Sequence, residues 1–192
     1  MSGVLVERGN NGDILLDINI GQPPQPPVFD DWWLPSIDEC SYMYTNLKTF
    51  NIGGFADEPY WSSTEDSATQ VKMVWFENGE IGSGVKAWIA GFKFRAVRRF
   101  FTEEEIYSVR DQGEAGGLIF AVEPTEGGYW NYEVTPTDLG QSTWSNITNQ
   151  LAGADLESIG LGMFNTATII NQVGHTNSPA KVCDDLVSDF GN

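Results

Sequence analysis

Positive side chains are concentrated in one part of an otherwise acidic chain. Half of the ten Lys and Arg residues lie in a stretch that contains no acid, namely Lys86, Lys93, Arg95, Arg98 and Arg99. Such groups can bind an anionic group of a ligand, pair with carboxylates of a neighbouring subunit, or lie in solvent. For Lys93, Arg95 and Arg99 we expect side chains that lie in solvent or pair with a neighbouring subunit. A role in ligand recognition is the alternative.

Arg98 is expected to point into the core. Residues 91–100 have the composition of a strand, and side chains alternate between the two faces of a strand. Arg98 falls on the same face as Phe92 and Phe94. An unpaired charge in the interior costs several kcal/mol or more, so Arg98 needs a carboxylate partner. Three carboxylates are candidates for this structural role: Glu65, Glu133 and Asp138.

The string WSSTE at residues 61–65 has groups that can bind a sugar. It brings together an indole ring, which can stack on a sugar ring, with hydroxyls and a carboxylate, which can bind sugar hydroxyls. The same residues can pack a core and close a turn. If the chain binds a glycan, the expected site residues, exposed and close together, are Trp61, Ser63 and Glu65 with Arg95 or Arg99.

The net charge restricts the partners. There are 27 Asp and Glu residues, which gives a net charge of -17 and a pI of about 4.1. This field repels phosphate backbones and polysulfated polymers, so we expect no nucleic-acid partner and only a neutral or mildly acidic saccharide. No apolar run approaches the roughly 18 to 20 residues that span a bilayer, and the N-terminus lacks a secretory-signal pattern. We expect neither membrane insertion nor export by the Sec route.

Metal, cofactor and catalytic patterns are missing from the sequence. Cys40 and Cys183 belong to no CxxC or Cys/His pattern, and His175 is the single histidine. The acidic pairs at 30–31 and 184–185 are expected from the abundance of acids alone. We therefore expect no metal, no cofactor, no catalytic residue and two buried thiols.

The prolines divide the chain into two parts. Four of the nine prolines lie between Pro23 and Pro27, which favours an extended polyproline spacer. Residues 1–27 are thus predicted to form an anchoring arm with its spacer, and residues 28–192 a globular domain.

Hydrophobic spacing and turn residues predict an α+β domain with a mostly antiparallel sheet and two or three short helices. Ser36 and Glu39 form a capping box before a helix that buries Ile37, Cys40, Tyr44 and Leu47. Further helices are predicted near Asn165, burying Ile169, Ile170 and Val173, and from Ser178, burying Val182, Cys183 and Leu186. Strands are predicted at 70–76, 84–89, 91–100, 117–122 and 130–134, with a hairpin turn at Asn78-Gly79. In Trp32-Trp33, alternation allows only one side chain to face inward.

Several strings share a family pattern. They are DWWLPS at 31–36, GGF at 53–55, YWSSTE at 60–65, WFENG at 75–79 and RAVRRF at 95–100. Together they closely resemble the C-terminal domain of bacterial collagen-like adhesins, a family common in bacterial surface proteins and phage virion proteins. GGLIF at 116–120 and CDDL at 183–186 resemble the other half of the same domain, which comes first in the family. The resemblance therefore covers roughly residues 28–190 as a circular permutation.

The resemblance implies a C-type-lectin-like fold that is usually trimeric, works in adhesion and binds glycans in some members. Because WSSTE is a family hallmark, it favours a fold-keeping role for that string. The permutation predicts that residues 101–116 connect the former ends of the domain, so that the strand ending at Phe100 lies beside the strand starting at Gly117. Exchange of halves between subunits is the alternative.

These observations predict a non-enzymatic virion structural protein of a bacteriophage. The arm would bind other virion proteins and display an adhesin-like domain, as a homotrimer, at the virion surface after assembly in the host cytoplasm. A head decoration or fibre and a tail adhesin, bound to a host-surface glycan, are both compatible with the sequence. The alternatives are a structural cement module without ligand and, more weakly, an enzyme of the formylglycine-generating type.

Overall fold

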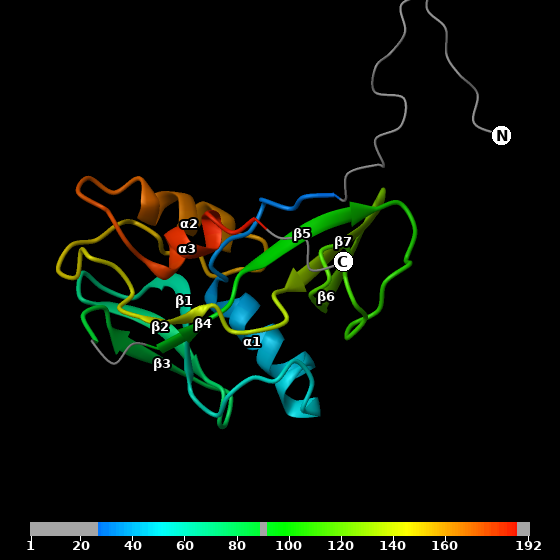
Figure 1. Ribbon diagram of the computed structural model, residues 1–192, viewed down its shortest axis with the longest axis horizontal. Helices are drawn as coiled ribbons and strands as arrows, with labels where there is room; N and C mark the ends of the chain where they lie inside the picture. Colours follow the sequence, from blue (N-terminus) through cyan, green and yellow to red (C-terminus); the bar gives the residue numbers. More distant parts are fainter. Residues whose placement is uncertain (1–26, 89–91, 188–192) are drawn as a thin grey trace, which may run out of the picture.

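Two β-sheets and three short α-helices make up the computed structural model, which describes residues 27–88 and 92–187 (Figure 1). The helices are α1 (Ile37–Asn46), α2 (Gly162–Ile170) and α3 (Pro179–Asp184), and a 3-10 turn, η1 (Lys48–Phe50), follows α1. The predicted α+β class with mostly antiparallel pairing is confirmed. The predicted arm lies outside the described residues, apart from Pro27.

The larger sheet has the strand order β3-β2-β1-β4-β8, and the smaller one has the order β5-β7-β6. The strands of the larger sheet are β1 (Pro59–Glu65), β2 (Gln70–Trp75), β3 (Glu80–Val85), β4 (Phe92–Phe94) and β8 (Gly140–Ser142). Those of the smaller sheet are β5 (Val97–Thr102), β6 (Leu118–Thr125) and β7 (Gly128–Val134). The β2–β3 hairpin turns at Asn78-Gly79 as predicted, with Gly79 at a φ of 80°.

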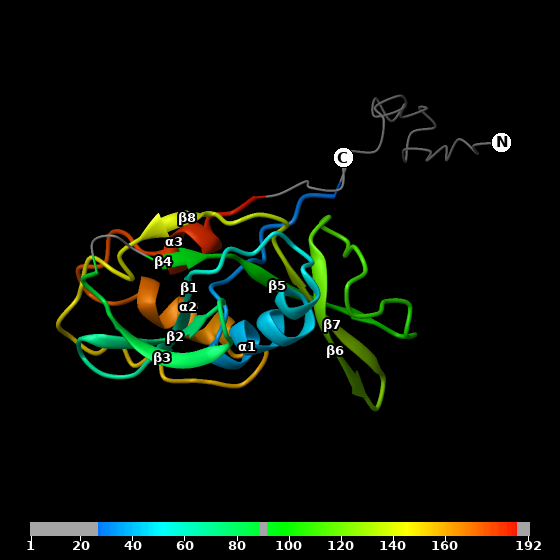
Figure 2. The same cartoon turned by 90° about the horizontal axis from the view of Figure 1, so that it is seen from below.

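The larger sheet is covered on both faces (Figure 2). Tyr60 and Val74 pack with α1 on one face, and Trp61 and Met73 pack in the cluster that includes residues of α2 and α3 on the other. Since β1 lies in the middle of this sheet, six of its seven residues are buried, Pro59 being the exception.

The single strand predicted at 91–100 is wrong. β4 belongs to the larger sheet and β5 to the smaller one, and the chain passes between them at Arg95 and Ala96. Every residue from Phe94 to Arg98 is buried, which simple alternation cannot produce. The assignment of Arg95 to the outer face of this strand is therefore wrong, whereas Arg98 is buried as predicted.

The predicted helix starts are confirmed at α1 and α3. Ser36 Oγ accepts a bond from Glu39 N, while a Glu39 carboxylate oxygen accepts from Ser36 N at 2.6 Å, which completes the capping box. At α3, Ser178 Oγ accepts a hydrogen bond from Lys181 N, without a reciprocal bond from the side chain of Lys181. Two burial predictions are wrong: Val173 is 96% exposed because α2 ends at Ile170, and Val182 is 41% exposed on the outer side of α3.

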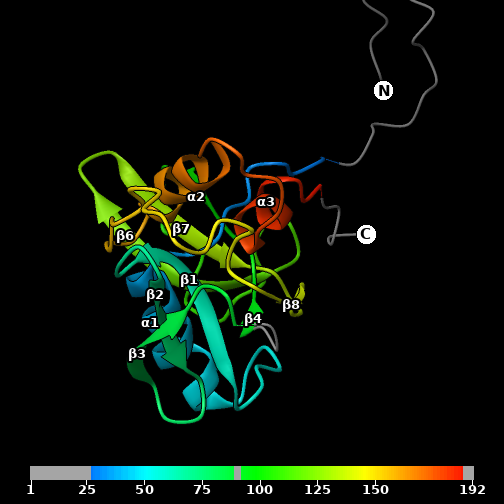
Figure 3. The same cartoon turned by 90° about the vertical axis from the view of Figure 1, so that its left-hand side faces the viewer.

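The ends of the described chain leave the domain at the same edge (Figure 3). β5 and the strand that begins after Gly117 lie in the same sheet, as predicted, but β7 lies between them. Direct adjacency of these two strands was therefore wrong. The segment between them is anchored: Arg110 donates through Nε to the carbonyl of Asn46 at the end of α1, and its guanidinium lies 3.5 Å from the centre of the Phe50 ring.

Candidate functional site

Trp61, Ser63 and Glu65 form no exposed recognition surface. Their exposed fractions are 0%, 0% and 6%. They lie on the central strand β1, where both faces of the sheet are covered. Trp61 instead packs 4.3 Å from the ring centre of Phe92 and donates its indole N–H to the carbonyl of Ser142 at 2.8 Å. The prediction of an exposed sugar-binding surface at WSSTE is thus wrong.

Glu65 holds a loop in place. Its carboxylate pairs with Lys86 Nζ at 2.5 Å, and both side chains are almost completely buried. The same carboxylate accepts backbone N–H bonds from each residue of the loop 152–154, at 2.7 to 3.1 Å. Burial would raise the pKa of Glu65, but the hydrogen bond from Lys86 and those from the loop outweigh it and hold this pKa below its ordinary value.

Arg95 is also structural. Only 1% of it is exposed, its Nε donates to Asp138 at 2.7 Å, and its guanidinium lies 3.7 Å from the Phe55 ring centre. Lys93 lies 3.4 Å from Asp138 as well. The charge of Arg95 is therefore satisfied within the chain, without solvent or a neighbouring subunit. Its assignment to a recognition surface is wrong.

Arg98 is buried and ion-paired as expected, with Glu133 at 3.2 Å. Its main partner is Asp31, which it contacts through two nitrogens at 2.7 and 3.1 Å. Asp31 was not among the expected partners, because it lies in the segment before α1 that the sequence did not place. This bidentate pair fixes that segment against β5.

Arg99 is the one residue of the predicted site that remains available. It is half-buried, and its guanidinium lies 4.5 Å from the ring centre of Trp130. Among the described residues, Arg99 and Arg110 are the two cations with no carboxylate within 4.0 Å. The Arg99 guanidinium therefore lies beside an indole face, and the hydroxyl near it, that of Tyr132, donates to the carboxylate of Glu123 at 2.7 Å.

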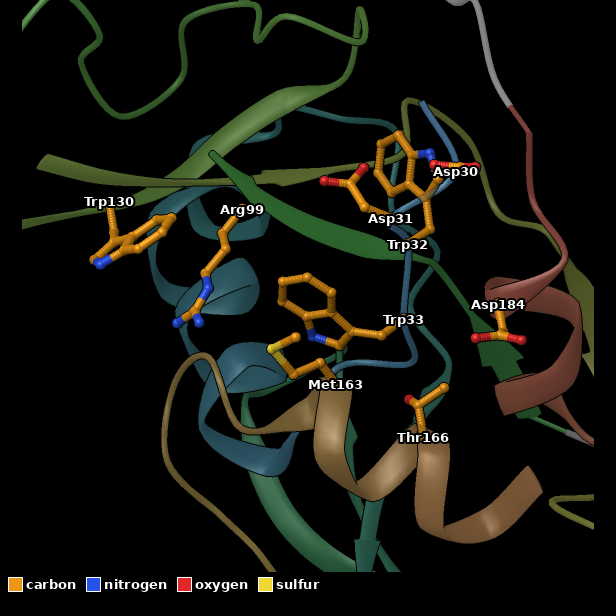
Figure 4. Close-up of a pocket in the computed structure, with 9 residues that line it drawn as sticks. All are labelled: Asp30, Asp31, Trp32, Trp33, Arg99, Trp130, Met163, Thr166 and Asp184. Carbon is orange, nitrogen blue, oxygen red and sulfur yellow. The ribbon is translucent and has the colours of Figure 1, made fainter. Parts of the chain in front are cut away.

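Arg99 and Trp130 form one wall of a pocket of about 350 Å³ (Figure 4). The pocket lies between β5, β7, the segment before α1, and helices α2 and α3. Its lining residues are Asp30, Asp31, Trp32, Trp33, Arg99, Trp130, Met163, Thr166 and Asp184. The volume falls in the lower part of the range of small-molecule sites, which is about 300 to 1,000 Å³.

A buried carboxylate orients the central indole of this pocket. Glu39 accepts the Trp33 indole N–H at 3.2 Å and the backbone N–H of Gly160 at 2.8 Å, in addition to closing the capping box. Burial raises the pKa of Glu39 to about 7, against the lowering effect of these hydrogen bonds. The helix start predicted from the sequence thus also positions a residue of the pocket.

Sequence reasoning missed most of this pocket. Both Trp32 and Trp33 are buried, at 2% and 4% exposure, because their segment is not a regular strand and pairs its backbone with β5 at the single Trp33–Val97 bridge. The acidic pairs at 30–31 and 184–185 were attributed to chance. The available signal was the run DDWW, which puts carboxylates and indoles side by side in a segment without regular structure.

The described residues include no group of acids, histidines and cysteines suited to a metal ion, and no helix of sufficient apolar length to cross a membrane. A scan against protein-family models, a search of the curated proteins and a search of the solved structures found no match. The chemistry of the site therefore has to be argued from its own geometry.

Proposed function

We propose that the chain is a non-enzymatic virion structural protein of a bacteriophage, whose adhesin-like domain binds a small saccharide in the pocket beside Arg99. The pocket itself carries this proposal: it is the place in the described chain where the half-buried indole of Trp130, an arginine with no carboxylate within 4.0 Å and exposed carboxylates meet, while the other two indoles of the lining are buried. Indole rings stack on the C–H faces of sugars, and guanidinium and carboxylate groups bind their hydroxyls.

The charges of the pocket favour a neutral or mildly acidic sugar. Asp30 and Asp184 are exposed carboxylates, while Asp31 is already paired with Arg98. Beside Arg99, these acids suit a ligand with many hydroxyls and at most one carboxylate. A sulfated polymer would be repelled by these two carboxylates and by the net charge of -17.

Solvent exposure of these acids supports binding over hydrolysis. A glycosidase needs one carboxylic acid kept protonated in an apolar surrounding. Asp30, Asp31 and Asp184 are all exposed. The formylglycine-generating type of enzyme is also disfavoured, because Cys40 and Cys183 are 0% exposed and burial raises the pKa of both thiols well above the ordinary value.

Display on a particle is the second half of the proposal, and it rests on the sequence. The arm and polyproline spacer provide an attachment, and the family resemblance provides the setting. The proposal includes a circularly permuted, C-type-lectin-like domain. The common edge at which both described ends leave the domain supports this permutation (Figure 3). The homotrimer now rests on the resemblance alone, since most of the basic stretch is paired within the chain.

One observation favours the alternative of a structural cement module. Asp30 and Asp31 line the pocket a few residues after Pro27, where the spacer enters the domain. A neighbouring virion protein that binds the spacer would therefore also cover the pocket. In that case the indoles would bury a protein segment in place of a sugar.

A glycan array probed with the full chain tests the ligand. We expect binding to neutral or carboxylated saccharides that is lost in Arg99→Ala and in Trp130→Ala. Arg110→Ala is the matched control, because Arg110 also stacks on an aromatic ring without a carboxylate partner and lies outside the pocket. No binding by the wild type, or equal loss in Arg110→Ala, would favour the cement module.

A further inference from the structure

Three of the four edge strands are protected against pairing with another chain. β8 has three residues. β6 contains a bulge and Pro124, and its residue Ile119 exchanges backbone hydrogen bonds with the preceding loop. β5 is covered at its start by Trp33, which exchanges two backbone bonds with Val97 at 2.8 and 2.9 Å. Short length, bulges, prolines and covering segments are the usual means of blocking sheet edges.

β3 is the least protected of the four in the described chain: the Trp88 N–H donates to the carbonyl of Val85 at 3.0 Å, so a turn closes its last residue, and no other loop in that part of the chain makes a backbone–backbone hydrogen bond to residues 80–85. All six of its residues pair with β2 in continuous register, without a bulge or a proline, and it is the last strand of the larger sheet. Ile81 is 54% exposed and Val85 is 42% exposed. Alternate residues of an edge strand point their N–H and C=O groups outward, so this edge can accept a further strand.

The sequence of β3 is complementary to itself. Ile81, Ser83 and Val85 share one face of the strand, and Gly82 and Gly84 share the other. In an antiparallel pair of two β3 strands centred on Ser83, Ile81 lies opposite Val85 of the partner subunit, and the two serines face each other. Cross-strand pairs of β-branched residues are favourable in antiparallel sheets, and each Ser83 hydroxyl remains bonded to Asp66 of its own chain.

The edge is also poor in charge. Glu80, at the first position, is the one charged residue of β3, although Asp66, which accepts a hydrogen bond from Ser83 Oγ at 2.8 Å, adds one carboxylate near the centre of the pair. Two copies that each carry a net charge of -17 repel one another, so they meet most easily where few charges lie.

We infer that the β3 edge binds the β3 edge of a second copy of this chain, which joins two five-stranded sheets across a two-fold axis. β3 lies at the end of the domain remote from the point where the spacer enters (Figures 1 and 3), so attachment through the arm leaves this edge free. The inference is independent of the pocket and its ligand.

The mass of the full chain in solution tests the pairing. Light scattering should give twice the chain mass of 21.2 kDa at high concentration, with more dimer at moderate than at low salt, because salt screens the repulsion. Association through the basic stretch would show the opposite salt dependence. A mass that stays at one chain, or at the three chains of the proposed homotrimer without doubling to six, overturns the inference.

Lysine substitutions locate the interface. Ile81→Lys and Val85→Lys should each raise the dimer dissociation constant at least tenfold, since edge lysines block strand pairing. Val173→Lys is the matched control, because Val173 is 96% exposed on a different part of the surface. Circular dichroism checks that each variant is folded. A dimer that tolerates both edge lysines overturns the inference.

A cysteine gives a second, independent readout. Residues directly opposite in an antiparallel pair have Cβ atoms about 4.5 to 5.5 Å apart, slightly more than a disulfide spans, so treatment of Ser83→Cys with a short bifunctional thiol reagent should yield a covalent dimer. Cys40 and Cys183 are buried and do not compete. Cross-linking no faster than in Val173→Cys would contradict the pairing.

Discussion

Replacing Lys86 by methionine should destabilise the domain strongly. The variant leaves the Glu65 carboxylate, with 2% of its side chain exposed, without its cation, and it also removes the ammonium 4.8 Å from the Trp144 ring centre. Breaking a buried ion pair by removing one partner costs about 3 to 5 kcal/mol. Since the N–H groups of the loop 152–154 still bind Glu65, we expect the lower end, about 3 kcal/mol.

The assay is thermal and urea unfolding of both proteins. For a chain of this size each kcal/mol shifts Tm by roughly 2 to 4 °C, so the Lys86→Met variant should melt about 6 to 12 °C lower. Lys181→Met is the matched control: its ion pair with Asp185 is exposed and should contribute at most about 0.5 kcal/mol.

The stability difference between the wild type and Lys86→Met should also depend on pH, in a direction set by the pKa of Glu65. The folded-state pKa of Glu65 lies below its unfolded value, so its contribution is present above the unfolded pKa and is lost as pH falls. The difference in stability between wild type and Lys86→Met should therefore shrink in acid. A variant within 1 kcal/mol of the wild type at neutral pH would refute the structural role of the Lys86–Glu65 ion pair.

Further predictions concern the arm, Glu39 and the thiols. Deletion of residues 1–27 should leave Tm within a few degrees, measured by calorimetry; unfolding or aggregation would show that the arm is part of the core. Because the pKa of Glu39 is raised to about 7, stability should fall by about 1 kcal/mol between pH 6 and pH 8 in urea titrations, a loss that is missing in Glu39→Gln. Cys40 and Cys183 should react with a thiol reagent only at the rate of unfolding; fast labelling of the native protein would contradict their burial.

Local signals predicted the parts of the fold that are held locally. The capping box of α1, the Ser178 cap of α3 and the Asn78-Gly79 turn each depend on a few neighbouring residues, and all three are confirmed. The split between β4 and β5 could not be predicted, because the passage at Arg95 depends on Asp138, which is distant in sequence. The alternation of side chains alone predicted a single strand over residues 91–100.

The pocket could be predicted only in part for the same reason. Arg99 was a candidate from the sequence, but its neighbour Trp130 comes from another strand and Asp184 from the last helix. Glu65 was a candidate both for a sugar site and for pairing with a buried cation, because its chemistry suits either role. Which of the two it meets is decided by the position of β1 in the sheet, and composition does not contain that information.

Host adsorption by particles that carry the chain tests the central claim most directly. Particles with Arg99→Ala should contain the same number of copies as the wild type and adsorb to host cells several-fold more slowly, while particles with Arg110→Ala should adsorb normally. Equal adsorption of wild type and Arg99→Ala, at equal copy number, would contradict a displayed ligand-binding domain.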